Sequence, residues 1–367
     1  MDVGVVDGEV AVQPIEFGSI IANRYTILRP DKVGTPGAFI CRELDVEPLR
    51  SLWALRSRYD GDPTGQAFLS EMGQVQKLEH PQLRRVLDFG RDPSGVLYAV
   101  YEPLEIRSFN DLLEKEWPLG EERVVWLMCQ LLATLEVAHA AGLTHGDLRP
   151  ENVLVRAASS TSQNEELLLC GLGLANSARH GFPNRQSGTQ HKLPSWVVGT
   201  PSYAAPEQLR GERHDARSDV YGAGLLMFQL LTRTLPFIAS NDYDTAFMQC
   251  FTPPPPPSGY ARVTPALEAI CLKALTKTPD MRYESANEMR AALLASQATR
   301  SSRASGRVSV VRSSRAPLAR VSTPPAEEVV ATRISETEPY QLRVDAITAA
   351  PIETPLPAAA PETRQRS

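Results

Sequence analysis

The chain has 367 residues, 42% of them hydrophobic, and its formal net charge is -5. This length accommodates one large two-lobed domain or two ordinary domains with tails, and the apolar fraction is enough for a sizeable core. The slightly acidic charge balance argues against a nucleic-acid or polyanion binder.

Five cysteines are scattered along the chain without a CxxC pair or a His/Cys cluster, which argues against a disulfide framework and a zinc site. Residues 1–17 have early acidic residues and no long apolar run, unlike a signal peptide. No apolar stretch approaches the ~18 residues needed to cross a membrane. We therefore expect a cytoplasmic protein with reduced thiols and no membrane span.

The first third of the sequence is typical of a small sheet with one helix. Residues 1–22 are predicted to form a weakly ordered lead-in, and residues 23–104 short strands broken by turns. One strand includes residues 54–56 and another spans 96–101. Between them, apolar residues recur at helical spacing over residues 67–78, at Phe68, Met72, Val75 and Leu78.

Helical patterns dominate residues 105–297. The first long segment has one apolar stripe made of Leu127, Leu131, Leu135 and Ala138. A later segment is apolar nearly all round, which predicts a helix buried at the centre of its lobe. The proline run at 253–257 can be neither helix nor central strand, so it must be a connector. The expected helices are 124–141, 220–232, 265–275 and 285–294.

Residues 298–367 are rich in Ser, Thr, Arg, Pro and Ala and contain few aromatic residues. Such a segment cannot bury enough apolar surface to offset the entropy of ordering, so we predict a disordered tail. Six arginines between residues 300 and 320 are interspersed with serines. We interpret them as a solvated linker, and a phosphorylation target or a docking strip for an acidic partner is the alternative.

The most informative stretch is L-T-H-G-D-L-R-P-E-N-V-L-V at residues 143–155. It matches the catalytic loop H-R-D-L-x-x-x-N at His145, Asp147, Leu148 and Asn152. A carboxylate at Asp147 can accept the proton of a substrate hydroxyl, and an amide five residues later can hold a metal bound to phosphates. The same two residues could instead only hold the loop through local hydrogen bonds.

With this loop the chain resembles the bacterial, Hanks-type Ser/Thr protein kinases over residues 24–296. The segment G-T-P-S-Y-A-A-P-E, which ends at Glu207, looks like the end of an activation segment, and S-D-V-Y-G looks like the start of the central helix. The resemblance implies an α+β, two-lobed fold with a β-rich N-lobe (23–104) and a helical C-lobe (105–297). It also implies that Glu207 pairs with Arg282 and that Asp219 braces the backbone of the catalytic loop.

The metal-binding D-F-G motif of this family is altered here to L-L-C-G-L-G-L-A at residues 168–175. When residues 173–175 are aligned with the Gly-Leu-Ala that is usual in the family, Gly171 takes the position of the magnesium-binding Asp. A shift of the alignment by one residue puts Cys170 there. Neither side chain offers an oxygen ligand to a hard cation. Asn152 would be the one remaining metal ligand, so magnesium binding is left open.

The phosphate-binding elements also depart from the family. In W-A-L-R, Arg56 stands in the place of the strand-borne lysine, and arginine is longer and planar. Its expected partner on the N-lobe helix is Glu71, and the pair could be a phosphate clamp or simply a salt bridge between strand and helix. The loop at residues 32–40 keeps two glycines at the wrong spacing, and Pro36 stiffens it.

These departures predict a pseudokinase, a signalling scaffold or regulatory binding module for protein partners. Weak ATP binding could remain at the hinge, where the Glu102 carbonyl and the Leu104 amide would meet adenine. One alternative is an active, atypical kinase that transfers the ATP γ-phosphate to protein Ser/Thr, with Asp147 as base and Asn152 holding one metal. Another is a nucleotide sensor. The oligomeric state is left open.

Overall fold

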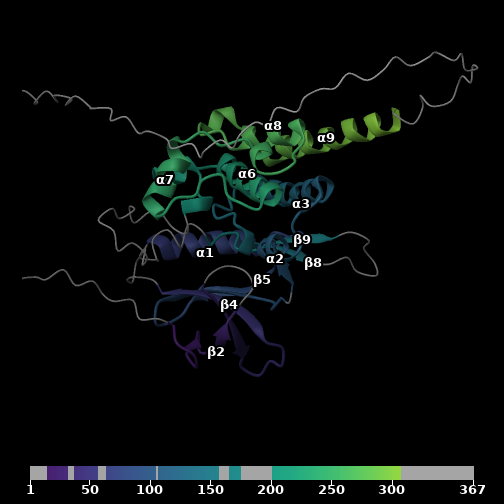
Figure 1. The fold of residues 1–367 in the computed structure, drawn as a ribbon. Coiled ribbons are helices and arrows are strands. Elements are labelled where there is room, and N and C mark those ends of the chain that lie inside the picture. The colour runs from purple at the N-terminus through teal and green to yellow at the C-terminus, as the bar shows by residue number, and fades with distance from the viewer. Residues whose placement is uncertain are drawn as a thin grey trace, which may run out of the picture. The chain divides into compact units, whose positions relative to one another are not determined.

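The computed structural model describes residues 15–31, 37–56, 63–104, 106–156, 165–174 and 201–306. The chain divides into two compact units, residues 1–311 and 312–367, and all described residues belong to the first. Within that unit a β-rich N-lobe is followed by a helical C-lobe (Figure 1), which confirms the expected α+β, two-lobed fold.

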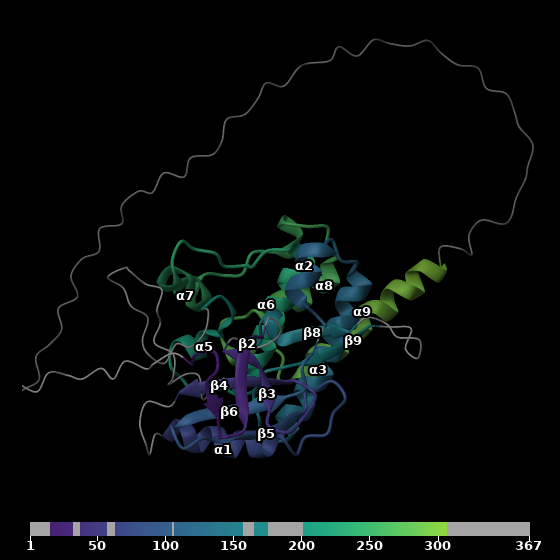
Figure 2. The ribbon, with the colours of Figure 1, turned by 90° about the horizontal axis from the view of Figure 1, so that it is seen from below.

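The N-lobe contains an antiparallel sheet in the order β1-β2-β3-β4-β6-β5, seen from below in Figure 2. The interior strand β6, between β4 and β5, has no exposed residue, because alternate side chains enter two apolar clusters on opposite faces. This burial explains why the strand reads as one continuous apolar run. The strands are β1 (Ile20–Ile21), β2 (Tyr25–Pro30), β3 (Ala38–Glu43), β4 (Arg50–Arg56), β5 (Val86–Arg91) and β6 (Val96–Tyr101).

Helix α1 (Pro63–Val75) covers one face of this sheet, against β5 and β6 (Figure 1). Its residues Phe68 and Met72 are fully buried, and the Phe68 ring lies 5.7 Å from the ring of Trp53 on β4. The predicted helix is therefore confirmed. It begins four residues earlier than the expected segment and ends before Leu78, which still packs on the core.

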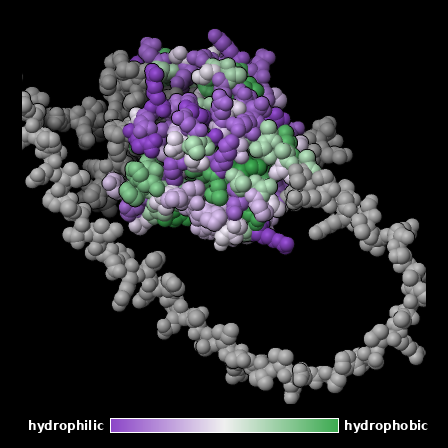
Figure 3. Space-filling model, turned by 90° about the horizontal axis from the view of Figure 1, so that it is seen from above, coloured by the Kyte–Doolittle hydropathy of each residue, from purple (hydrophilic) through white to green (hydrophobic). Residues whose placement is uncertain are grey.

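The C-lobe is built on α3 and α6. The predicted apolar stripe of α3 is fully buried, and α6 is buried on nearly all sides, as expected for a helix at the centre of its lobe. The face of the molecule in Figure 3 is mostly hydrophilic with separate hydrophobic spots. The helices are α2 (Phe109–Lys115), α3 (Glu121–Ala140), α5 (Pro206–Leu209), α6 (Ala216–Thr232), α7 (Asp242–Phe251), α8 (Pro265–Ala274) and α9 (Ala286–Gly306).

Short elements connect these helices and carry the candidate site. A second, antiparallel sheet has the order β7-β8-β9, and the backbone bridge between Leu83 and Leu169 links β9 to the segment that precedes β5. The strands are β7 (Arg107–Ser108), β8 (Val153–Arg156) and β9 (Glu166–Leu169). The 3-10 turns are η1 (Pro150–Asn152), η2 (Pro201–Tyr203), η3 (Pro257–Gly259) and η4 (Pro279–Met281).

Two boundaries predicted from the sequence are wrong. Strand β1 lies inside the expected lead-in of residues 1–22, because its backbone pairs with β2. Helix α9 continues to Gly306, past the boundary at residue 298, although the apolar periodicity has ended by then. The predicted disorder of the tail concerns residues 307–367, which lie outside the described residues.

In the part of the chain that the structure describes, no helix is both long enough and apolar enough to cross a membrane.

Candidate nucleotide and phosphotransfer site

The loop between α3 and β8 is held by the buried carboxylate of Asp219 on α6. Asp219 Oδ2 accepts the backbone N–H of His145 at 2.7 Å, and Oδ1 accepts that of Gly146 at 2.8 Å. His139 Nε2 lies 2.8 Å from Oδ2. Burial acts to raise the pKa of Asp219, but its contacts with the two histidines and Gly146 outweigh burial and hold that pKa below its ordinary value. The predicted bracing contact is thus confirmed.

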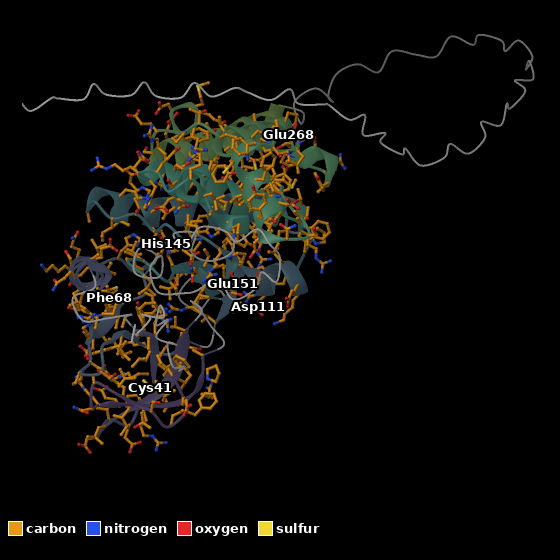
Figure 4. The ribbon with its side chains drawn as sticks, turned by 90° about the vertical axis from the view of Figure 1, so that its left-hand side faces the viewer. Cys41, Phe68, Asp111, His145, Glu151 and Glu268 are labelled. Carbon is orange, nitrogen blue, oxygen red and sulfur yellow. The ribbon has the colours of Figure 1, made fainter. Side chains whose placement is uncertain are left out.

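His145 joins this loop to the segment after β9. Its ring is fully buried at the junction of the two lobes (Figure 4). Nδ1 accepts the backbone N–H of Asp147 at 3.3 Å, so the ring proton is assigned to Nε2, which donates to the Cys170 carbonyl at 2.7 Å. The two chain segments that carry the candidate catalytic and metal-binding positions are therefore locked together.

The structure brings the two candidate catalytic residues together. Asn152 Nδ2 donates to the Asp147 carbonyl at 2.9 Å and to its carboxylate Oδ2 at 3.2 Å. The Arg149 guanidinium lies 3.2 Å from the same Oδ2. Burial raises the pKa of Asp147, and the charge of Arg149 offsets part of that rise. Arg149 was not singled out from the sequence, although it stands two residues after Asp147 in the matched loop.

The position of the expected metal-binding Asp holds no oxygen ligand. Gly171 has no side chain, and its φ of 85° lies in the left-handed region that favours glycine. Cys170 is fully buried, and burial raises the pKa of its thiol to about 11. Among the described residues, no three His, Cys, Asp or Glu side chains gather into a group that could hold a metal. The residues present do not fit a magnesium ion held by two protein ligands.

The segment after Gly171 nevertheless completes the core between the lobes. Leu172 and Leu174 are buried in the main apolar cluster. Between them, a Cβ added to Gly173 would lie 3.0 Å from Val75 Cγ2 and 3.2 Å from Met72 Sδ, both on α1. The close approach of this backbone to α1 requires glycine.

A buried ion pair ties the end of the activation segment to the C-lobe. Arg282 Nη1 and Nη2 donate to the two carboxylate oxygens of Glu207 at 2.7 and 2.8 Å, and Ser218 Oγ donates to Oε1 at 2.6 Å. Burial acts to raise the pKa of Glu207, but Arg282 outweighs it and holds the pKa below its ordinary value. The predicted contact between Glu207 and Arg282 is confirmed.

Comparison with known proteins decides the family. The family model of the protein kinase domain matches residues 53–292. The chain belongs to the protein kinase family. Curated proteins that match it include bacterial serine/threonine kinases.

The kinase pkn3 of Myxococcus xanthus is 34% identical over 284 residues, which cover 76% of this chain and 51% of that protein. PknB of Mycolicibacterium smegmatis is 32% identical over 266 residues, which cover 71% of this chain and 41% of that protein. The chain thus matches about half, or less, of the length of these relatives.

A solved structure supports the fold. The kinase domain of PknI from Mycobacterium tuberculosis superposes with a TM-score of 0.57 at 20% identity, and the match covers 78% of this chain and all of that domain. At this identity the likeness shows the shared kinase fold alone.

The phosphate-binding side of the kinase site is described only in part. Arg56 pairs with Val96 across β4 and β6, but its side chain lies outside the described residues, as do residues 32–36 of the candidate phosphate loop. Glu71 is half-buried on α1. Contact between Arg56 and Glu71 therefore stays a prediction.

The kinase hinge follows β6. The Leu104 side chain packs on a small cluster of Leu154, Leu168 and Cys170. The Glu102 carbonyl, expected to meet adenine, accepts a hydrogen bond from Arg84 Nη2 at 2.8 Å. Arg84 was not predicted from the sequence. The one sequence feature that points to it is a charged residue between the apolar Leu83 and strand β5.

Proposed function

We propose that this kinase domain is a pseudokinase, which binds protein partners in a signalling pathway as a scaffold or regulatory module. The observation that carries the proposal is Gly171, which stands where the family places a magnesium-binding carboxylate. Magnesium neutralises the charge that develops on the transferring phosphoryl group. If the lost ligand is worth roughly 4 kcal/mol, phosphotransfer falls by about three decades.

Two further replacements act in the same direction. Arg56 stands in the place of the lysine that contacts the α- and β-phosphates, and Pro36 lies in the glycine-poor loop that would cover them. Their effects on the rate need not add to that of Gly171, since all three residues would act on the same phosphates.

The retained architecture supports a binding role. Asp219 still braces the catalytic loop, and Glu207 still pairs with Arg282 inside the C-lobe. These buried contacts stabilise the fold whether or not phosphate is transferred. A module with an intact fold and a damaged metal site can present a kinase surface to partners without turnover.

An active, atypical kinase is the second candidate, favoured by the catalytic loop. Asp147 has a raised pKa, which suits a general base, and its carboxylate lies 3.2 Å from Asn152 Nδ2. In that case Asp147 would accept the hydroxyl proton of a protein Ser or Thr, and Asn152 would be the one metal ligand.

A labelled-phosphate assay on generic protein substrates separates the two candidates. We expect transfer to be undetectable, or at least about a thousandfold below the 1–100 per second of typical kinases. Asp147→Asn should then change nothing. Gly171→Asp restores a carboxylate at the metal position, so in a domain that admits ATP it should introduce magnesium-dependent transfer.

The decisive contrary outcome is robust wild-type transfer that Asp147→Asn abolishes. That result would establish the active-kinase candidate. Residual transfer that survives Asp147→Asn would instead indicate a contaminating kinase, since no family mechanism proceeds without this carboxylate.

A further inference from the structure

Arg84 is a buried cation at the junction of the two lobes. Its backbone N–H donates to the Leu169 carbonyl at 2.9 Å, just before Cys170 and Gly171. The residue is 9% exposed. The Arg84 backbone is therefore bound to the segment that holds Cys170 and Gly171, where the family places its metal-binding Asp.

From there the side chain extends to the hinge. Arg84 Nη2 donates to the Glu102 carbonyl at 2.8 Å, and the guanidinium lies 4.8 Å from the centre of the Tyr101 ring. The guanidinium also acts on the Cys170 thiol, where its charge opposes the effect of burial on the thiol pKa. The side chain thus spans from Leu169 to Glu102, with the Tyr101 ring and the Cys170 thiol beside it.

Keeping a guanidinium here carries a cost. Its buried Nε has no hydrogen-bond partner among the described residues. Burying a charge with such incomplete compensation destabilises a fold, and an apolar side chain would serve packing better. The arrangement therefore calls for an explanation other than stability.

We propose that Arg84 closes the base pocket of this domain to adenine. The hinge carbonyl of Glu102 is the acceptor that the adenine amine would use in a kinase. Here Arg84 already donates to that carbonyl and occupies one of its two lone pairs, and the guanidinium beside it has no acceptor for the adenine amine. Under this proposal the hinge does not bind adenine, whereas the sequence-based expectation was weak binding there.

This inference rests on the proposed function, because it uses the kinase hinge, and it adds a cause of inactivity independent of Gly171. Isothermal titration of the full chain with ATP, without magnesium, tests it. Wild type should bind ATP at least about tenfold more weakly than Arg84→Val, the difference expected for one restored hinge hydrogen bond. Arg85→Val is the matched control, since it removes an adjacent, exposed arginine, and it should behave as wild type.

Arg84→Met provides a second variant of similar length in case valine leaves a gap, and circular dichroism verifies folding of both. Equal ATP affinity of wild type and a folded Arg84 variant would overturn the inference, as would the absence of binding in both folded variants. A gain in Arg85→Val equal to that in Arg84→Val would also overturn it, because a general charge effect would then explain both.

The phosphotransfer assay keeps the two proposals apart. An Arg84→Val protein that binds ATP but transfers no phosphate supports both. If wild type and Arg84→Val bind ATP equally and neither transfers phosphate, the Arg84 inference is overturned and the pseudokinase proposal stands. Wild-type transfer from ATP overturns both, since it requires adenine in the pocket.

Discussion

The buried Arg282 and the half-buried Lys277 differ in the hydrogen bonds and ion pairs that their neighbours offer. Arg282 pairs with both oxygens of Glu207, and its Nε donates to the Thr276 carbonyl at 2.7 Å. Lys277, by contrast, donates to the hydroxyl of Tyr221 at 3.1 Å and lies over the Phe237 ring at 3.7 Å. Burial lowers the pKa of Lys277 to about 7.

The depressed pKa of Lys277 makes stability depend on pH. In the unfolded chain this lysine keeps its proton up to about pH 10.4, whereas in the fold it releases the proton near 7. Between these values the unfolded chain binds more protons, so this lysine makes stability rise with pH. We expect Lys277→Met to gain most stability over wild type below pH 7 and progressively less toward pH 10, as measured by urea unfolding.

The exposed Lys273 is the matched control, because it pairs with Glu288 on the surface. Lys273→Met should differ from wild type by a small amount that shows no such dependence on pH. A stability difference between Lys277→Met and wild type that stays constant from pH 6 to pH 10 would contradict the assigned pKa.

Among the elements, α1 and the segment after β9 depend on each other. Leu172 and Leu174 bury their side chains in the shared core, and Gly173 between them brings the backbone against α1. This contact joins an N-lobe helix to the C-lobe without any side chain from Gly173. The packing is therefore sensitive to one methyl group.

Gly173→Ala tests this contact. The new Cβ would lie 3.0 Å from Val75 Cγ2, and the alanine would have to keep a φ of 79°. Both overpacking and backbone strain therefore oppose the substitution. Gly142→Ala is the control, because Gly142 has a φ of 76° and open space around it. In urea unfolding, we expect Gly173→Ala to lose about 1–3 kcal/mol more than Gly142→Ala. Equal losses in the free energy of unfolding for the two variants would mean that α1 shifts to accommodate the new methyl group without cost.

On the scale of the whole described unit, one apolar cluster extends through both lobes. It includes Phe68 of α1, Leu131 of α3, Phe228 of α6 and Leu293 of α9. Helix α9 packs against α3, α6 and α8. The C-terminal helix is thus part of the common core.

Truncation separates the core helix from the tail. A chain that ends at Gly306 keeps α9 and loses a segment with a single aromatic residue, so its melting temperature should stay near that of the full chain. A chain that ends at Ser285 loses the fully buried Ala286, Met289 and Leu293, and it should fail to fold. A fall of many degrees for the first truncation would show that the tail packs on the domain.

Periodicity and short motifs located most of the architecture. The stripe that includes Leu127 and Leu131 predicted α3, and the run at residues 96–101 predicted β6, because helices and strands repeat over a few residues. The contact of Glu207 with Arg282 was predicted from the family resemblance, since no local pattern links residues so far apart.

Tertiary structure alone decided the rest. Strand β1 forms because β2 offers backbone partners, and Arg149 reaches Asp147 only in the folded loop. Arg84 reads in the sequence as one of two adjacent arginines. Its contact with Glu102 depends on segments that are distant along the chain, and the energy of a buried charge is set by the groups that folding brings around it.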